Sequence, residues 1–212
     1  MEQDISFGAS PVACVIFAIT IIITLIAFYN EELTSKLILQ PYNVSRGKRV
    51  YTLITSGFIH GDWMHLIFNM MTFYFFAFNV EKALGHWQFA LLYMVSLILS
   101  DLPSVAKHRN DLWYRSLGAS GAISAVVFSA ILFNPLGKMM ILIIPIPIPA
   151  VLFGVLYLVY CSYASKRAQD NINHDAHFFG ALSGIMITVL LVPQVIPYFF
   201  HTVTEGIQSL LH

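Results

Sequence analysis

Six stretches of the chain contain no Asp, Glu, Lys or Arg, and each is about as long as a helix that crosses a membrane. They cover residues 5–30, 63–80, 83–100, 116–137, 139–165 and 176–204. A helix needs about 20 apolar residues to cross the hydrocarbon core, where only helices and closed barrels satisfy every backbone hydrogen bond. The stretches favour helices because apolar and polar residues do not alternate strictly in them. The sequence therefore predicts an all-α membrane protein with six transmembrane helices, near 11–29, 64–81, 84–102, 119–135, 148–165 and 176–193.

The composition excludes the common classes of soluble protein. Hydrophobic residues make up 58% of the 212 residues, charged residues make up 10%, and the mean hydropathy is +0.73. A soluble domain of this size cannot bury so much apolar surface. Eleven basic residues balance eleven acidic ones, so we expect no nucleic acid partner. The two cysteines, Cys14 and Cys161, lie in apolar runs, where we expect buried thiols rather than a disulfide framework.

The predicted helices form one unit over residues 11–193, with an N-terminal tail at 1–10 and a C-terminal tail at 194–212. The long connection at 31–62 mixes charged and apolar residues, so we expect part of it to lie at the membrane interface. The run from Ile144 to Pro149 alternates isoleucine and proline. Proline cannot continue a helix, so this run is expected to be a loop before the fifth helix.

Polar residues gather at the starts of the second, fourth and sixth predicted helices. They include His65 and Asn69, one turn apart, Ser120 within Gly118–Ala125, and His177 within His174–Gly180. Each of these helices follows an odd-numbered connection, so the three clusters lie toward the same membrane face. Polar groups inside a membrane are costly and often functional. The topology therefore predicts that Ser120, His177, His65 and Asn69 meet at one depth.

These residue types can together carry out nucleophilic catalysis. A serine hydroxyl becomes nucleophilic when a base removes its proton, and His177 could do this for Ser120 and later return the proton to the leaving amine. The backbone amide of Ser120, at the start of its helix, and the side chains of His65 and Asn69 could stabilise an oxyanion. Losing one such donor typically lowers the rate by about 10²–10³-fold.

Small residues on two of the helices predict close packing beside this site. Gly121 and Ala125 follow Ser120, while Gly180 and Gly184 follow His177 at the same four-residue spacing. Such pairs allow helices in a membrane to approach closely. We expect this contact to hold Ser120 and His177 together.

A metal site is the competing interpretation of the same region. The candidate ligands are His60, His65, His174, Asp175 and His177. The His-Glu-x-x-His motif is absent, but His174 and His177 are three residues apart, which one zinc ion could accept. The Gly-x-Ser-x-Gly motif of soluble hydrolases is also absent, because Ala122 occupies its last position.

Together these motifs resemble the rhomboid family of intramembrane serine proteases over about residues 50–193. They are HxxxxHLxxNM from His60 to Met70, EKALG from Glu81 to Gly85, GASG at 118–121, and AHxxGxxxG from Ala176 to Gly184. The resemblance implies a six-helix rhomboid-like bundle with a half-embedded first loop. It implies a dyad of Ser120 and His177 and an oxyanion site of His65, Asn69 and the Ser120 amide. It also implies transmembrane protein substrates in the lipid bilayer, a lateral gate formed by the fifth helix and the loop before it, and no metal or cofactor.

The sequence departs from the family pattern at two sites. Family members often carry Trp-Arg where Tyr51-Thr52 stand here, and many carry an aromatic residue, stacked on the base, where Ser124 stands. Phe178 and Phe128 are the candidates to orient His177 in its place. Glu81 is expected to pair with a basic or backbone partner in the second connection.

Two further features leave alternatives open. The odd-numbered connections hold nine of the eleven basic residues, which predicts that they face the cytoplasm, whereas the family resemblance implies the opposite orientation in a bacterial inner membrane. Besides an active protease, the sequence is compatible with an inactive rhomboid-like protein that binds membrane clients. A transporter or metal-handling protein is the third alternative, although no inverted repeat supports it.

Overall fold

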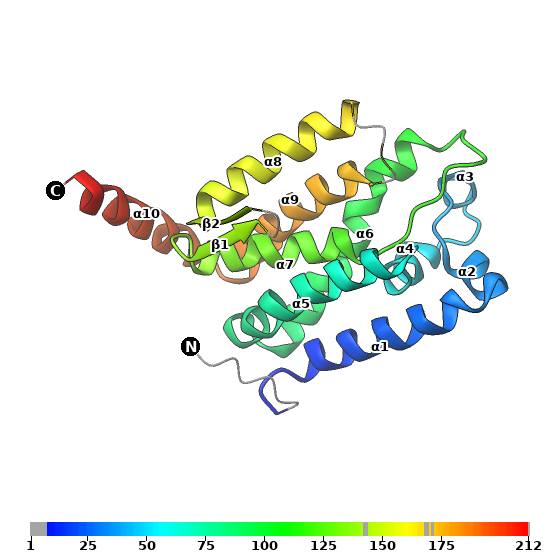
Figure 1. Cartoon of the computed structure of the whole chain (residues 1–212), viewed down its shortest axis with the longest axis horizontal. Coiled ribbons are helices and arrows are strands. Elements are labelled where there is room, and N and C mark those ends of the chain that lie inside the picture. The colour runs from blue at the N-terminus through cyan, green and yellow to red at the C-terminus, as the bar shows by residue number, and fades with distance from the viewer. Residues whose placement is uncertain (1–7, 142–143, 168–169, 171, 212) are drawn as a thin grey trace.

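The computed structural model of the chain describes residues 8–141, 144–167, 170 and 172–211, and it is a bundle of helices with one small hairpin (Figure 1). Of the predicted N-terminal tail, residues 1–7 lie outside the described part. The six predicted spans coincide with six helices, which are α1 (Pro11–Phe28), α5 (Trp63–Leu84), α6 (His86–Lys107), α7 (Ser120–Phe133), α8 (Ala150–Arg167) and α9 (His174–Leu191). The C-terminal segment forms a further helix, α10 (Val195–Leu211), which extends away from the bundle in Figure 1.

Three helices of the described chain are long and apolar enough to cross a membrane by length and composition. They are α1, α6 and α9, while α7 is apolar but shorter. The fold is a helical membrane bundle, as predicted. The count of six crossings and the limits of the unit at 11 and 193 stay predictions.

The first connection is folded and is tied to the rest of the bundle. It contains three short helices and a 3-10 turn, which are α2 (Glu31–Leu37), α3 (Pro41–Val44), α4 (Thr52–Thr55) and η1 (Ser56–Phe58). Leu39 exchanges two backbone hydrogen bonds of 3.0 Å with Ser116, just before α7. The guanidinium of Arg49 donates to the carbonyls of Ser35 and Lys36, and Tyr51 Oη also donates to Lys36 O. Arg49 and Tyr51 therefore tie this part of the first connection to α2.

The expectation of a loop at Ile144–Pro149 is wrong. This segment is strand β2 (Ile144–Pro149), paired antiparallel with β1 (Lys138–Ile141) in a hairpin before α8. Alternate residues of a strand point their N–H groups to opposite edges. The three prolines occupy alternate positions, so the donors that they lack all fall on one edge, and the other edge can pair with β1.

Glu81 joins the start of α1 to the second connection. Its carboxylate, fully buried, accepts hydrogen bonds from the amides of Val12 and Ala13 at 3.1 and 2.6 Å, and lies 2.7 Å from His86 Nδ1. The basic partner in the second connection was predicted, but the two amides of α1 were not. Because the first amides of a helix have no partner within it, a carboxylate stabilises that end.

The contact between α7 and α9 is the tightest in the bundle. A Cβ atom on Gly180 would lie 2.8 Å from the carbonyl carbon of Gly121, and one on Gly184 would lie 2.8 Å from the carbonyl carbon of Ala125. Real side chains do not fit at that distance from a neighbouring backbone. The small residues therefore let the two backbones touch, directly beside Ser120 and His177.

We expect Gly180→Ala and Gly184→Ala each to destabilise the protein by about 1–3 kcal/mol or more, since the added methyl group meets backbone that cannot move aside. SDS-driven unfolding in mixed micelles measures this change. Gly154→Ala is the matched control on α8, because its Cβ would meet side chains and no backbone, with the flexible end of Ile131 at 3.2 Å and the ring of Phe128 at 3.4 Å. Equal effects at all three glycines would contradict the packing role.

Candidate functional site

A central cavity of about 1070 Å³ brings the four predicted site residues together. Ser120, His177, His65 and Asn69 all line it. Its wall also includes residues of the three connections that precede α5, α7 and α9, such as Gly61, Ser116 and Asn173. The cavity is therefore bounded by the odd-numbered connections, on the face where the sequence places the polar clusters.

Ser120 is the first residue of α7 and follows a turn that only glycine accommodates. Gly118 has φ +116°, and a Cβ on it would lie 2.6 Å from His65 Nε2. The Gly118 amide donates to Ser56 O at 2.9 Å, which ties the turn to the first connection. The His65 ring therefore packs directly against the turn that carries Ser120, whose amide has no partner within the helix.

His177 lies in the first turn of α9, which Asn173 anchors. The Asn173 side chain caps the helix by accepting from the Ala176 amide at 3.0 Å, and it also bonds Ser104 of α6 and Ser116. Between the described residues Ser120 and His177, no hydrogen bond is formed. Both side chains face one cavity, and in enzymes such bonds are often loose until substrate is bound.

Asn69 and His65 are linked along α5. The Asn69 amide nitrogen donates to the carbonyl of His65 at 2.9 Å. This bond uses one of the two hydrogens on that nitrogen, which leaves the other for a ligand in the cavity. Asn69 is thus held in place by its own helix while it lines the cavity.

The ring of His60 packs against the ring of His65. Thr24 Oγ1 contacts the carbonyl of Phe58 at 3.1 Å and His60 Nδ1 at 3.0 Å. Since the hydroxyl has one proton to donate to the carbonyl, it accepts from His60 Nδ1, and the lone pair of His60 lies on Nε2. The rings of His60 and His65 meet edge to face, 4.9 Å between centroids.

The aromatic partner of His177 is Tyr157 on α8, which sequence reasoning missed. The two rings are nearly parallel, at 14°, with centroids 6.4 Å apart. Tyr157 Oη also shares a hydrogen bond of 2.8 Å with Ser124 Oγ. Of the predicted candidates, Phe128 packs on Tyr157, and Phe178 lines a different groove. Ser124 itself was the available signal, because a hydroxyl in place of a ring leaves space for a ring from another helix.

The comparison with known protein families shows which family has this sequence. The Rhomboid domain model matches residues 47–194, which is more than half of the chain and contains all four predicted site residues. The chain belongs to the rhomboid family.

Individual relatives agree with this assignment. The rhomboid is 30% identical over 153 residues to a Bacillus subtilis protein, YdcA, with 68% of each chain covered. It is 25% identical to RHOMBOID-like protein 12, mitochondrial, of Arabidopsis thaliana, over 72% of this chain and 50% of the relative. It is 26% identical to the human presenilin-associated rhomboid-like protein, mitochondrial, over 76% and 40%. The chain thus spans half or less of the two mitochondrial relatives.

The candidate metal ligands of this rhomboid separate into different environments. Asp175 pairs with Lys107 at 2.7 Å, and His60 bonds Thr24. His174 and His177 stay together, and Cys161 of α8 joins them, with one ligand atom of each within 4.8 Å of the others. The predicted pairing of His174 with His177 therefore has a third member that the sequence did not indicate.

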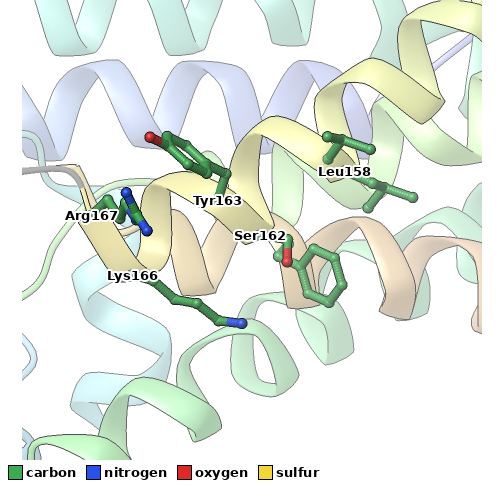
Figure 2. A pocket seen from close by; sticks show the side chains of 7 residues that line it. Leu158, Ser162, Tyr163, Lys166 and Arg167 are labelled. Carbon is green, nitrogen blue, oxygen red and sulfur yellow. The ribbon is translucent and has the colours of Figure 1, made fainter.

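A second groove of about 580 Å³ follows α8 and shares no lining residue with the central cavity. Figure 2 shows Leu158 and Ser162 along this groove, with Lys166 and Arg167 at its charged end. It contains none of the predicted site residues, so the candidate chemistry lies in the central cavity.

His60 predicts a pH dependence of stability. Burial lowers its pKa from 6.5 to about 3, helped by the nearby His65. Because the unfolded chain binds a proton that the folded chain excludes, stability falls as the pH drops below about 6.5, by about 2 kcal/mol between pH 7 and pH 5. We expect His60→Asn, which keeps a donor toward Thr24, to remove this part of the pH slope in SDS-driven unfolding. The exposed His201→Asn is the control, and a wild-type slope in both variants would contradict the prediction.

Proposed function

We propose that this rhomboid is an intramembrane serine endopeptidase that cleaves in or near the transmembrane segments of membrane proteins, with Ser120 as nucleophile and His177 as base. The observation that supports it best is the placement of both side chains in one polar cavity, on the two helices that touch most closely. The Bacillus subtilis relative bears the name "Putative rhomboid protease YdcA", which assigns the same class of activity to that protein.

In this mechanism His177 removes the proton of Ser120 Oγ while the oxygen attacks the scissile carbonyl. The negative charge passes to the carbonyl oxygen, and His177 returns the proton to the leaving amine. Water from the cavity then repeats the sequence on the acyl-enzyme, and Ser120 is restored. The steps need no metal and no cofactor.

The oxyanion is stabilised by donors that converge on the start of α7. These are the Ser120 amide, the Asn69 side chain and the His65 ring, which packs on the Gly118 turn. The ring of His60, held by Thr24, packs edge to face on the His65 ring and so limits its movement. Donors fixed in this way stabilise charge without reorganisation.

Tyr157 is proposed as the residue that positions His177. Its ring stacks on the imidazole, and its hydroxyl is anchored on Ser124 of α7, where many rhomboids carry the stacking ring itself. An aromatic ring in this position limits rotation of the base. The ring is thus supplied by α8 while its anchor remains on the helix of the nucleophile.

Substrate is proposed to enter past α8 and the hairpin before it. Figure 1 shows α8 on the outside of the bundle beside α9, and its Phe153 and Tyr157 cover the central cavity. A transmembrane segment could reach Ser120 from the bilayer if this helix moved outward. The relationship to YdcA favours a bacterial inner membrane as the location.

An inactive rhomboid-like protein that binds membrane clients is the second candidate. The names of the mitochondrial relatives carry no statement of activity. The presence of both Ser120 and His177 in the cavity favours the protease over this alternative and over a transporter.

We expect Ser120→Ala and His177→Ala each to lower cleavage of a fluorogenic transmembrane peptide in liposomes by about 10⁴-fold or more, to background. Ser162→Ala, in the outer groove, is the matched control and keeps wild-type activity. A fluorophosphonate probe labels wild-type protein at Ser120. Full activity of Ser120→Ala would refute the assignment, and a wild type that is folded but neither cuts nor reacts would favour the client-binding protein.

Tyr157 and Ser124 are expected to act as one unit. Tyr157→Phe and Ser124→Ala remove the same hydrogen bond, so each should lower kcat by up to about 10-fold with little change in KM, and the double variant should be no worse than either. Tyr157→Leu also removes the ring and should lower kcat further. Independent, multiplying effects in the double variant would show that the hydrogen bond does not position the base.

A further inference from the structure

We propose that Cys161, His174 and His177 form a binding site for a single zinc-like divalent cation. Cys161 comes from α8, and the two histidines lie one turn apart on α9. The three ligand atoms lie within 4.8 Å of one another, with Cys161 and His174 buried and His177 partly accessible from the cavity. One thiolate and two imidazoles, with water as the fourth ligand, match the donor set and number that Zn²⁺ accepts.

His174 is arranged as a metal-binding histidine. Its Nε2 lies 3.1 and 3.2 Å from the two carboxylate oxygens of Asp170. A carboxylate accepts hydrogen bonds, so Nε2 is the N–H donor and the lone pair of the neutral ring is on Nδ1. The Nδ1 atom is buried and has no hydrogen-bond partner among the described residues, and the whole residue is 4% exposed. A histidine held by a carboxylate on one nitrogen and free on the other is the usual form of a zinc ligand.

The cluster needs only a small movement to close on a metal. Tetrahedral Zn²⁺ with these ligands has neighbouring ligand atoms about 3.3–3.7 Å apart, so the three atoms must approach by about 1 Å. Binding also releases the thiol proton of Cys161 to water, which makes the affinity rise with pH. Tyr160 packs edge-on against His174, so α8 and α9 are already in contact at this point.

The consequence for activity rests on the proposed function. A metal on His177 occupies the lone pair that would accept the proton of Ser120, so the bound cation is a reversible inhibitor. It also joins α8 to α9, which opposes the outward movement of α8. The same ion would therefore block the base and close the path to the cavity.

The first test is a Co²⁺ titration of the full-length protein in detergent, purified without a polyhistidine tag. We expect one Co²⁺ per chain, with a thiolate-to-cobalt charge-transfer absorption in the near ultraviolet that Zn²⁺ displaces. Cys161→Ser should abolish this band, and Cys14→Ser, on α1, should retain it. Asp170→Asn should weaken binding by about 10–100-fold. A folded wild type without the band, or a band that survives in Cys161→Ser, would overturn the proposal.

Two further measurements separate the site from its consequence. If Cys161→Ser fails to fold, alkylation of wild type decides: Zn²⁺ should slow modification of Cys161 and not of Cys14, and equal rates with and without Zn²⁺ would refute the site. In the peptide cleavage assay, the Zn²⁺ concentration that half-inhibits wild type should equal the concentration that half-saturates the site. Half-inhibition of Cys161→Ser should need a Zn²⁺ concentration at least about 10-fold higher, because one ligand is lost. A protein that binds Co²⁺ through Cys161 but has no protease activity keeps the metal site and loses only the proposed function.

Discussion

The backbone contact between α7 and α9 is the constraint on which the candidate site depends. Gly180 and Gly184 let α9 lie against the carbonyls of Gly121 and Ala125, and no larger residue fits. In a membrane, where the hydrophobic effect does not drive helices together, such close packing is a main source of association. Because Ser120 and His177 each precede this contact, the residues that pack the helices also set the distance between these two side chains.

Hydrogen bonds join the polar connections to one another at one end of the bundle. Leu39 pairs with Ser116, Gly118 bonds Ser56, and the Asn173 side chain joins the start of α9 to α6 and Ser116. The connections before α5, α7 and α9 are thereby linked to one another around the cavity. These contacts place polar side chains around the cavity, while the surrounding helices remain apolar.

The face of α8 that meets α9 carries two residues that lie near His177. Tyr157 stacks on His177, and Cys161, one turn later, lies with His174 and His177. The orientation of His177 is therefore coupled to α8, the helix on the outside of the bundle beside the cavity. Movement of α8 would change the stacking on His177.

The sequence by itself determined the class of fold, the six long helices and four of the residues that line the cavity. Long charge-free runs without strict alternation form helices in a membrane, and counting helices places Ser120, His177, His65 and Asn69 at one end. Only the tertiary structure decided which neighbours complete the site. Tyr157, Cys161 and the Glu81 contact with α1 come from helices that are distant in sequence, and the period of a helix says nothing about which helix it will meet. The hairpin at Ile144–Pro149 was missed for the same reason, because prolines exclude a helix, whereas a strand depends on the partner that pairs with it.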